Sequence, residues 1–285
     1  MKDQKKVTDQ HRAICVLGSG RCGTSAVTRS INLLGVEVGD NLISKAGPNP
    51  KGFWEDEKIV QVHQQLIRKF AKPLQPLPRG WIKKEKVKPY KEILTDYLKK
   101  NIANSDIWAF KDPRTALTLD LWIQIFDELD VLPHYLIMVR NPMDVIRSYK
   151  NSYNVNNKRS LYQWKLKTLS SLSKTRGERR LLIDYDHLID DSAGTLRSIS
   201  KAFHLSWPED EAPFIQKLNS FIDPNLQHSR SSMKKLMKSN EYSKEIKDLY
   251  RLCNKASGSP DFLNSDEFHA QVNALLKATS LDKKV

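Results

Sequence analysis

The sequence predicts an α/β protein built on a parallel β-sheet that is flanked by helices. Four short apolar segments are nearly continuous in hydrophobicity, as strands covered on both faces are. Each is followed by a helical pattern, and this alternation is typical of parallel sheets with right-handed crossovers. A chain of 285 residues suits one such domain. The expected strands cover residues 13–19, 106–110, 134–139 and 180–185.

Two of the helices that follow these strands have clear start signals. Asn141 follows the third strand and can cap a helix, with Pro142 at the first helical position, where a missing N–H does no harm. After the fourth strand, either Asp191 or Ser192 can cap the next helix. The order of strand, cap and helix therefore repeats along the chain.

The remaining segments extend this core without adding strands. Residues 1–12 are expected to form a flexible basic tail, and residues 13–230 to form the α/β domain. Within that domain, the proline-rich stretch 71–105 separates the first two strands and is expected to be a surface excursion that helps to shape the substrate site. Residues 231–285 are expected to form a helical C-terminal cap of the same domain.

Composition excludes several classes of protein. No stretch approaches the roughly 18 apolar residues of a membrane span, and no apolar segment after the basic N-terminus resembles a signal peptide. The three cysteines are widely spaced, which predicts neither a disulfide framework nor a metal site. A cytoplasmic location is expected. The net charge of +14 favours anionic partners, but no nucleic-acid-binding signature is present, and scattered surface lysines are the alternative explanation.

The segment "VLGSGRCGTS" places a glycine-rich loop directly between a strand and a helix. Gly18 and Gly23 have the spacing of a nucleoside-triphosphate loop, but Thr24 stands where that loop has its lysine. Backbone N–H groups at the start of the helix can hold an anion, and Arg21 adds a guanidinium group. The loop is therefore a candidate phosphate site, and a tight turn without a ligand is the alternative.

A second candidate site follows the third strand, in "LIMVRNPMDVIRSYKN". Arg140 ends the strand at the carboxyl edge of the sheet, where ligands of open α/β folds bind. Ser148 lies about two helical turns further on, so its hydroxyl can face the same side. The alternative for Arg140 is an ion pair with Asp144 at the start of the helix.

Acids and bases after the first and second strands make a third group. Glu55 lies near the start of an amphipathic helix, either as a carboxylate that complements the helix dipole or as a general base desolvated by its aromatic neighbours. His63 is a second candidate base. "FKDPRT" places Lys111 and Arg114 at the carboxyl edge of the sheet, and Asp112 between them is expected in a turn or an ion pair.

Five segments in this order resemble segments of the sulfotransferases that use 3′-phosphoadenosine 5′-phosphosulfate (PAPS), in the broad family of bacterial and carbohydrate sulfotransferases. The resemblance covers roughly residues 13–230 and implies the P-loop-like fold of that family. One loop of that family is built like a triphosphate loop but lacks its lysine. The segments are "GSGRCGTS", "GFWE", "KDPR", "VRNPMDVIRS" and "IDYDHLIDDSAGTLRSISKAF".

The resemblance implies an enzyme that transfers a sulfuryl group from PAPS to a hydroxyl group and releases adenosine 3′,5′-bisphosphate. It implies Glu55 as the catalytic base and Lys111 as a cation near the transferred group, and it implies no metal. The acceptor is a glycan or another small alcohol, and the oligomeric state stays open. The implied donor-binding residues are Arg21, Cys22, Gly23, Thr24 and Ser25 at the 5′-phosphosulfate, Arg140 and Ser148 at the 3′-phosphate, and Tyr185 near the adenine.

The chain departs from the family pattern at one position of the implied 3′-phosphate site. Many relatives have a basic residue four positions after the helix serine, whereas this chain has Ser152. Lys150, Lys158 or Arg159 is the candidate replacement.

Two other functions compete with sulfuryl transfer. A P-loop nucleotide kinase or NTPase would need Mg²⁺ and ATP or GTP, and the missing lysine counts against it. A non-catalytic basic protein that binds nucleic acid would have its cations along one face, whereas the basic residues of interest here lie at junctions of loops and helices.

Overall fold

The computed structural model describes residues 11–44, 51–71, 75–102, 105–222, 227 and 229–279. Its centre is a four-stranded sheet in which all neighbouring strands are parallel, in the order β2-β1-β3-β4. The predicted α/β class and the four predicted strands are confirmed. The strands are β1 (Arg12–Gly18), β2 (Ile107–Lys111), β3 (Leu132–Val139) and β4 (Arg180–Asp184).

Strand β1 lies in the middle of the sheet and is buried on both faces. Its first residue, Arg12, is in register with Ile107 of β2 on one side and with Leu132 of β3 on the other. Helices cover both sides of β1, and its five residues from Ala13 to Leu17 are at most 1% exposed. This double burial explains why the strand segments show continuous rather than alternating hydrophobicity.

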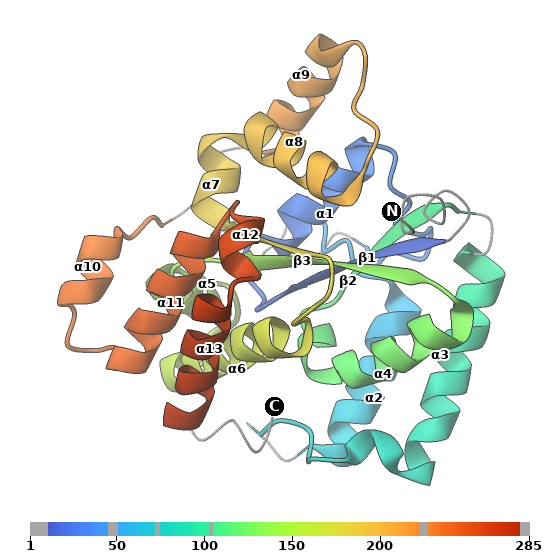
Figure 1. Ribbon diagram of the computed structural model, residues 1–285, viewed down its shortest axis with the longest axis horizontal. Helices are drawn as coiled ribbons and strands as arrows, with labels where there is room; N and C mark the ends of the chain where they lie inside the picture. The colour runs from blue at the N-terminus through green and yellow to red at the C-terminus, as the bar shows by residue number, and fades with distance from the viewer. Residues whose placement is uncertain are drawn as a thin grey trace.

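One face of the sheet is covered by α1 and α8, and α9 packs against both of these helices (Figure 1). Helix α7 is a short connection from β4 to α8. Of the two predicted caps of α8, the side chain of Asp191 is the one used, because it accepts a hydrogen bond from the N–H of Gly194 at 2.8 Å. The helices are α1 (Thr24–Leu33), α7 (Tyr185–Asp190), α8 (Ser192–Phe203) and α9 (Glu211–Phe221).

The opposite face is covered by α4 and α6, and α5 packs against α6 (Figure 1). Asn141 caps α5 as predicted, accepting a hydrogen bond from Met143 N at 3.0 Å, with Pro142 in the first turn. Trp122 of α4 and Trp164 of α6 are fully buried beneath the sheet. These helices are α4 (Thr115–Leu129), α5 (Pro142–Tyr153) and α6 (Asn157–Lys174).

The segment between β1 and β2 adds an outer helical pair to this face. Helix α3 packs against α2 and α4, and its Leu94 and Leu98 are buried there. Asp56 caps α2 by accepting from Ile59 N at 3.0 Å. The elements are α2 (Glu57–Phe70), two 3₁₀ turns η1 (Trp81–Lys83) and η2 (Glu85–Val87), and α3 (Lys88–Ile102).

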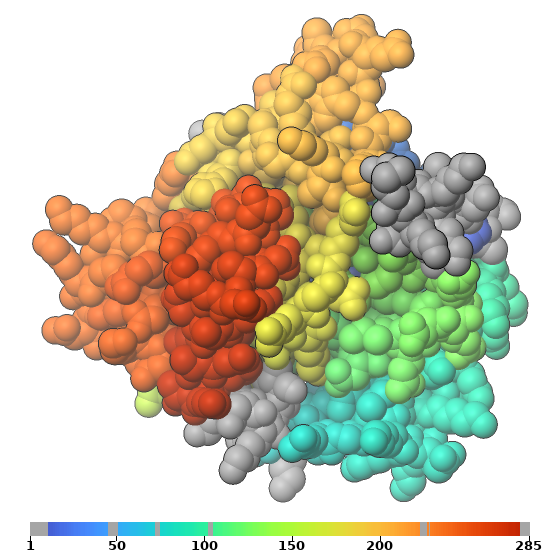
Figure 2. All heavy atoms as spheres, viewed as in Figure 1, coloured from blue at the N-terminus to red at the C-terminus, as the bar shows by residue number. Residues whose placement is uncertain are grey.

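Helices also form the C-terminal part of the chain. Helices α11 and α12 pack against the edge strand β4, and α13 packs against α6. Figure 2 shows these helices, in orange and red, as one flank of the molecule. They are α10 (Met233–Lys238), α11 (Lys244–Ala256), α12 (Pro260–Leu263) and α13 (Asp266–Ala278). Among the described residues, none of the helices has both the length and the apolar character needed to cross a membrane.

Most of the predicted basic tail, residues 1–12, lies outside the described residues. Only His11 and Arg12 are described, and Arg12 already belongs to β1. The three cysteines, Cys15, Cys22 and Cys253, are free and buried.

Candidate active site

The glycine-rich loop joins β1 to α1 at the carboxyl edge of the sheet. Gly18 has a φ of 145°, and a Cβ there would lie 2.6 Å from the carbonyl oxygen of Met138 on β3, so only glycine fits. Gly23 stands at the N-cap of α1 with a φ of 84°. No side chain caps α1, and its first turn contains no acidic residue. The positive end of this helix therefore faces the loop, as an anion site requires.

Arg140 lies beside this loop with its guanidinium group almost fully buried. It is 7% exposed, and its Nη atoms donate to the carbonyl oxygens of Arg21 at 3.3 Å and Ser229 at 2.8 Å. The guanidinium carbon is 4.6 Å from the centre of the Tyr185 ring. Its Nε–H is buried without a hydrogen-bond partner among the described residues. A buried donor of this kind is normally satisfied, so Arg140 is poised for an acceptor that the chain does not supply.

The alternative reading, in which Arg140 pairs with Asp144, is wrong. The carboxylate of Asp144 accepts instead from the backbone N–H and the hydroxyl of Ser231, both at 2.8 Å. No carboxylate of the described part of the chain forms an ion pair with Arg140. The carbonyl oxygen of Arg140 is held by the indole N–H of Trp164 at 3.1 Å, which fixes the end of β3.

Arg21 and Ser148 are brought together by the loop and α5. Arg21 has a φ of 68°, and its Nε donates to Ser148 Oγ at 2.8 Å. The guanidinium carbon also lies 6.0 Å from the centre of the Tyr153 ring. The Ser148 hydroxyl therefore lies beside the glycine-rich loop. The Arg21 side chain is directed toward the predicted 3′-phosphate residue Ser148, a placement that the sequence does not reveal.

Glu55 and Lys111 form an ion pair on the other side of the loop. The Nζ atom of Lys111 is 2.6 Å from Glu55 Oε1 and 3.2 Å from Ser25 Oγ in α1. Glu55 lies before Asp56, the N-cap of α2, so the interpretation of Glu55 as a carboxylate of the first helical turn is wrong. Both side chains are buried, and burial lowers the pKa of Lys111 although the Glu55 carboxylate opposes that change.

The ion pair continues into a buried hydrogen-bond network. Arg114 Nη1 lies 3.8 Å from Glu55 Oε2 and 2.7 Å from Asp112 Oδ1, as expected of Asp112 in an ion pair. Asp112 Oδ2 is 2.8 Å from Nδ1 of His63. Burial raises the pKa of the Asp112 carboxyl, but His63 and Arg114 outweigh it and hold the pKa well below its ordinary value.

The network fixes the tautomer of His63. The indole N–H of Trp122 can only donate, and it donates to His63 Nε2 at 2.8 Å. The proton of a neutral His63 is therefore on Nδ1, where it is donated to Asp112. Because His63 is fully buried and both ring nitrogens are engaged, it has no nitrogen left to accept a proton from a substrate.

Tyr149 of α5 packs against the glycine-rich loop at Gly20. A Cβ on Gly20 would stand only 2.2 Å from the phenolic oxygen of Tyr149. Burial raises the pKa of Tyr149 to about 12. Tyr149 directly follows Ser148, and the sequence contains no signal that would have marked it as a neighbour of the loop.

The candidate replacements for the cation missing at Ser152 line two hollows of the surface. Lys150 and Lys158 line a shallow depression at the α5–α6 connection, and Arg159 lines a separate cavity. Neither depression nor cavity includes Arg140 or Ser148 among its lining residues. The guanidinium group next to Ser148 is that of Arg21.

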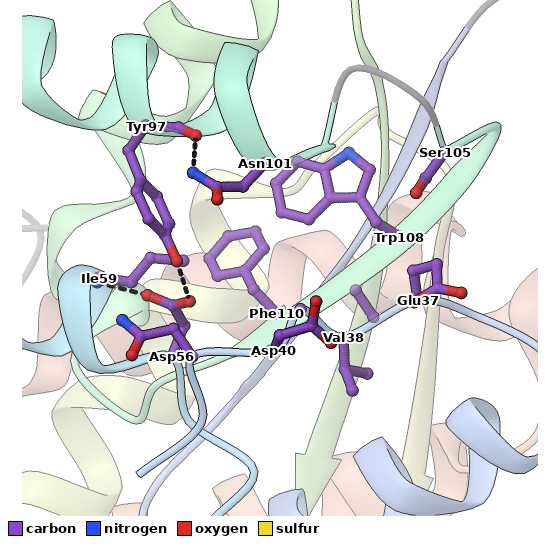
Figure 3. A pocket seen from close by; sticks show the side chains of 13 residues that line it. Glu37, Val38, Asp40, Asp56, Ile59, Tyr97, Asn101, Ser105, Trp108 and Phe110 are labelled. Atoms are coloured by element: carbon purple, nitrogen blue, oxygen red, sulfur yellow. Dashed lines mark hydrogen bonds between the residues drawn. The ribbon is translucent and has the colours of Figure 1, made fainter.

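An acidic cavity lies on the far side of Asp56. It has a volume of about 140 Å³, and Glu37, Asp40 and Asp56 contribute carboxylates to its wall. Figure 3 shows Asp56 held by the hydroxyl of Tyr97, at 2.6 Å, and by Ile59 N. This cavity repels anions and is not suited to a phosphate group. In the described ranges, no group of three or more His, Cys, Asp or Glu residues is arranged to hold a metal ion.

Comparisons with known proteins find similarity in structure. No protein-family model matches the chain, and no curated protein matches it at a significant level. The sulfotransferase domain of the curacin biosynthetic pathway is similar, with a TM-score of 0.42 and 13% identity over 95% of this chain and 98% of that one. The sulfotransferase domain of the Synechococcus PCC 7002 olefin synthase gives 0.45 and 15% over 96% of each chain. A sulfotransferase from Mycobacterium avium gives 0.47 and 13% over 98% of this chain and 79% of that one.

Proposed function

We propose that the chain is a sulfotransferase that moves a sulfuryl group from PAPS to a hydroxyl group and releases adenosine 3′,5′-bisphosphate. The observation that carries this proposal is the placement of two separate cationic groups around one lysine-free loop. Arg140 and Arg21 lie with Ser148 on one side. Lys111 lies with Glu55 on the other.

The residues present fit such a donor. A nucleotide with phosphate groups at both the 3′ and 5′ positions needs two anion sites a short distance apart. The loop and the start of α1 supply the first, largely with the backbone N–H groups of residues 21–25. Arg140, with its unsatisfied buried Nε–H, and Ser148 supply the second. Tyr185, stacked under Arg140, offers an aromatic surface next to the adenine.

Arg21 takes the place of the cation that is missing at Ser152. Its guanidinium group already donates to Ser148, so it can add a positive charge to the 3′-phosphate side of the site. Its carbonyl oxygen accepts from Arg140, which ties the two arginines to one geometry. Arg21 therefore links the two anion sites through a single residue.

Glu55 and Lys111 are suited to the transfer step. The donor supplies an activated sulfuryl group on a phosphate leaving group. The oxygen of the acceptor hydroxyl forms the new bond to sulfur, the bond from sulfur to the phosphate oxygen breaks, and the hydroxyl proton passes to the Glu55 carboxylate. Lys111, 3.2 Å from Ser25 of the loop, neutralises charge that develops on the oxygens around the sulfur.

Ligand-dependent thermal stability tests this proposal against a nucleotide kinase or NTPase. A ligand that binds only the folded state raises the midpoint of unfolding. We expect adenosine 3′,5′-bisphosphate to raise it equally with and without Mg²⁺, and ATP and GTP to give a smaller shift. A larger shift with ATP or GTP that requires Mg²⁺ would favour the NTPase and contradict the proposal.

A further inference from the structure

A large cavity opens next to the proposed transfer site, between α2, α5, α6 and the start of α4. Its volume is about 720 Å³, within the range of small-molecule sites. Two lining residues connect it to the site already described. Tyr149 closes the glycine-rich loop at Gly20, and Arg114 lies 3.8 Å from the Glu55 carboxylate. A molecule in this cavity is therefore close to both the loop and the proposed base.

The wall of this cavity carries positive charge only. Its cationic side chains are Arg68, Arg114, Arg159 and Lys167, and none of its lining residues is acidic. Apolar side chains such as Ile67 and Leu117 cover other parts of the wall. The two carboxylates that pair with Arg114, those of Asp112 and Glu55, are outside the cavity wall.

Lys167 is the most informative member of this group. It is 8% exposed, and its ammonium group forms no hydrogen bond or ion pair with any other described residue. Burial, and next the charge of Arg114, lower the pKa of Lys167 to about 8. Its Nζ atom is not among the fully buried atoms without a partner, so the ammonium group is open to the cavity that it lines. An anion in the cavity would pair with this ammonium group, for which the cavity wall offers no carboxylate.

We infer that this cavity binds the acceptor and that the acceptor carries an anionic group, a carboxylate or a sulfate, in addition to the hydroxyl that is sulfated. This inference rests on the proposed sulfuryl transfer and specifies its substrate class. Lys167 and Arg159 hold the anionic group, and the apolar wall contacts the carbon skeleton. Both acidic sugars and hydroxy acids have this chemistry.

Binding of matched acid and neutral probes tests the inference. The protein is first saturated with adenosine 3′,5′-bisphosphate, so that the probes cannot occupy the donor site. One pair is p-nitrophenyl glucuronide and p-nitrophenyl glucoside, and the other is hydroxydecanoate and its methyl ester. We expect the acid of at least one pair to bind roughly 10- to 150-fold more tightly than its neutral partner in calorimetry, as for hydrogen bonds to a charged group. The pair that shows this preference identifies the source, sugar or hydroxy acid.

Substitutions in the cavity wall test whether the preference for the acid probe arises in this cavity. Lys167→Met keeps most of the length of the side chain and removes its charge, and exposed Arg159→Gln serves as a second variant that leaves the buried face intact. We expect each to reduce the preference for the acid about tenfold or more. Lys165→Met, on the same helix but not in the cavity wall, should leave it unchanged.

Several outcomes would overturn the inference. They are equal affinity for acid and neutral probes, no binding of either acid, or an acid preference that survives both cavity variants. Failure of the bisphosphate to bind would instead contradict the proposed sulfotransferase function. The two failures are therefore distinguishable, because each is measured with a different ligand.

Discussion

The Cα of Gly23 faces the ring of Tyr185 so closely that an added Cβ would lie 2.2 Å from Cδ2 of the ring. Gly23 caps α1 at the 5′ side of the proposed donor site, and Tyr185 stacks under Arg140 at the 3′ side. The two halves of the site are thus in direct contact through a residue that has no side chain. A side chain at position 23 would therefore move the 5′ half of the site relative to the 3′ half.

We therefore expect Gly23→Ala to weaken binding of adenosine 3′,5′-bisphosphate by about tenfold or more, since strain of roughly 1–3 kcal/mol falls on the loop. Calorimetry measures the effect. Gly35→Ala is the matched control, because Gly35 has a similar φ of 88° and no atom within 4 Å of an added Cβ. That control should lose stability without losing affinity. Equal affinities of wild type and Gly23→Ala would contradict the placement of the donor.

Replacing Arg140 with Ala should weaken bisphosphate binding by about 1.5–3 kcal/mol, the usual range for a hydrogen bond to a charged group. Arg147→Ala, on helix α5, is the control. Arg147 is exposed, and its ion pair with Asp144 is long, at 4.0 Å. Titration calorimetry of both variants separates a role in binding from a general effect of charge. An unchanged dissociation constant for Arg140→Ala would remove Arg140 from the site.

Glu55→Gln should abolish sulfuryl transfer while the affinity for the bisphosphate stays close to that of the wild type. The amide cannot accept the proton of the hydroxyl, but its oxygen can still accept from Lys111. Release of bisphosphate from PAPS in the presence of an acceptor gives the rate, and calorimetry gives the affinity. Near-normal turnover would show that another group is the base.

His63→Ala should destabilise the protein without affecting the chemistry directly. It leaves the Trp122 N–H and one oxygen of Asp112 buried without a partner, at a cost of about 1–3 kcal/mol for each group. Urea unfolding measures the loss. His187→Ala, at an exposed histidine, should cost much less. A free energy of unfolding equal to the wild-type value would refute the proposed network.

Lys167 predicts a pH-dependent difference in stability. Its pKa is lowered to about 8 in the folded state, so above this pH the unfolded state binds more protons than the folded state. The free energy of unfolding attributable to Lys167 should therefore rise between about pH 8 and 10.4, the ordinary lysine value. Below about pH 8 both states are protonated and the full cost of burying the charge remains.

Comparison of wild type with Lys167→Met isolates this effect from other titrating groups. We expect the variant to be more stable than the wild type at pH 7 and the difference to shrink as the pH increases beyond 8. Urea unfolding at several pH values gives the free energy of unfolding of the wild type and of the variant. A difference that does not change with pH would show that Lys167 titrates normally.

Much of the fold could be predicted because local signals agree with the final packing. Each strand segment is buried on both faces, and Asn141 and Asp191 cap the helices for which they were candidates. Helix α2 begins at Glu57 with Asp56 as its N-cap, one of the residue types preferred there, so Glu55 lies outside the helix although the sequence places it near the start. Their different roles are decided by Lys111, which is distant in sequence and adjacent in space.

The site was predictable to the extent that its residues follow strands. Lys111 is the last residue of β2, and Arg140 directly follows β3. Parallel strands bring such positions to one edge of the sheet. Contacts between helix faces were not predictable. Nothing in the sequence indicates that the indole N–H of Trp122 donates a hydrogen bond to Nε2 of His63, or that Lys167 is buried beside Arg114.

The central position of β1 has a consequence for how the protein folds. The glycine-rich loop extends from a strand whose two neighbours are β2 and β3, both distant along the chain. Contacts of such long sequence separation slow folding, because the entropy of loop closure is lost before they form. Arg140 and Lys111 can reach the loop only after both neighbours have docked. Recovery of bisphosphate binding during refolding should therefore report the completion of the sheet and lag behind the return of helical signal.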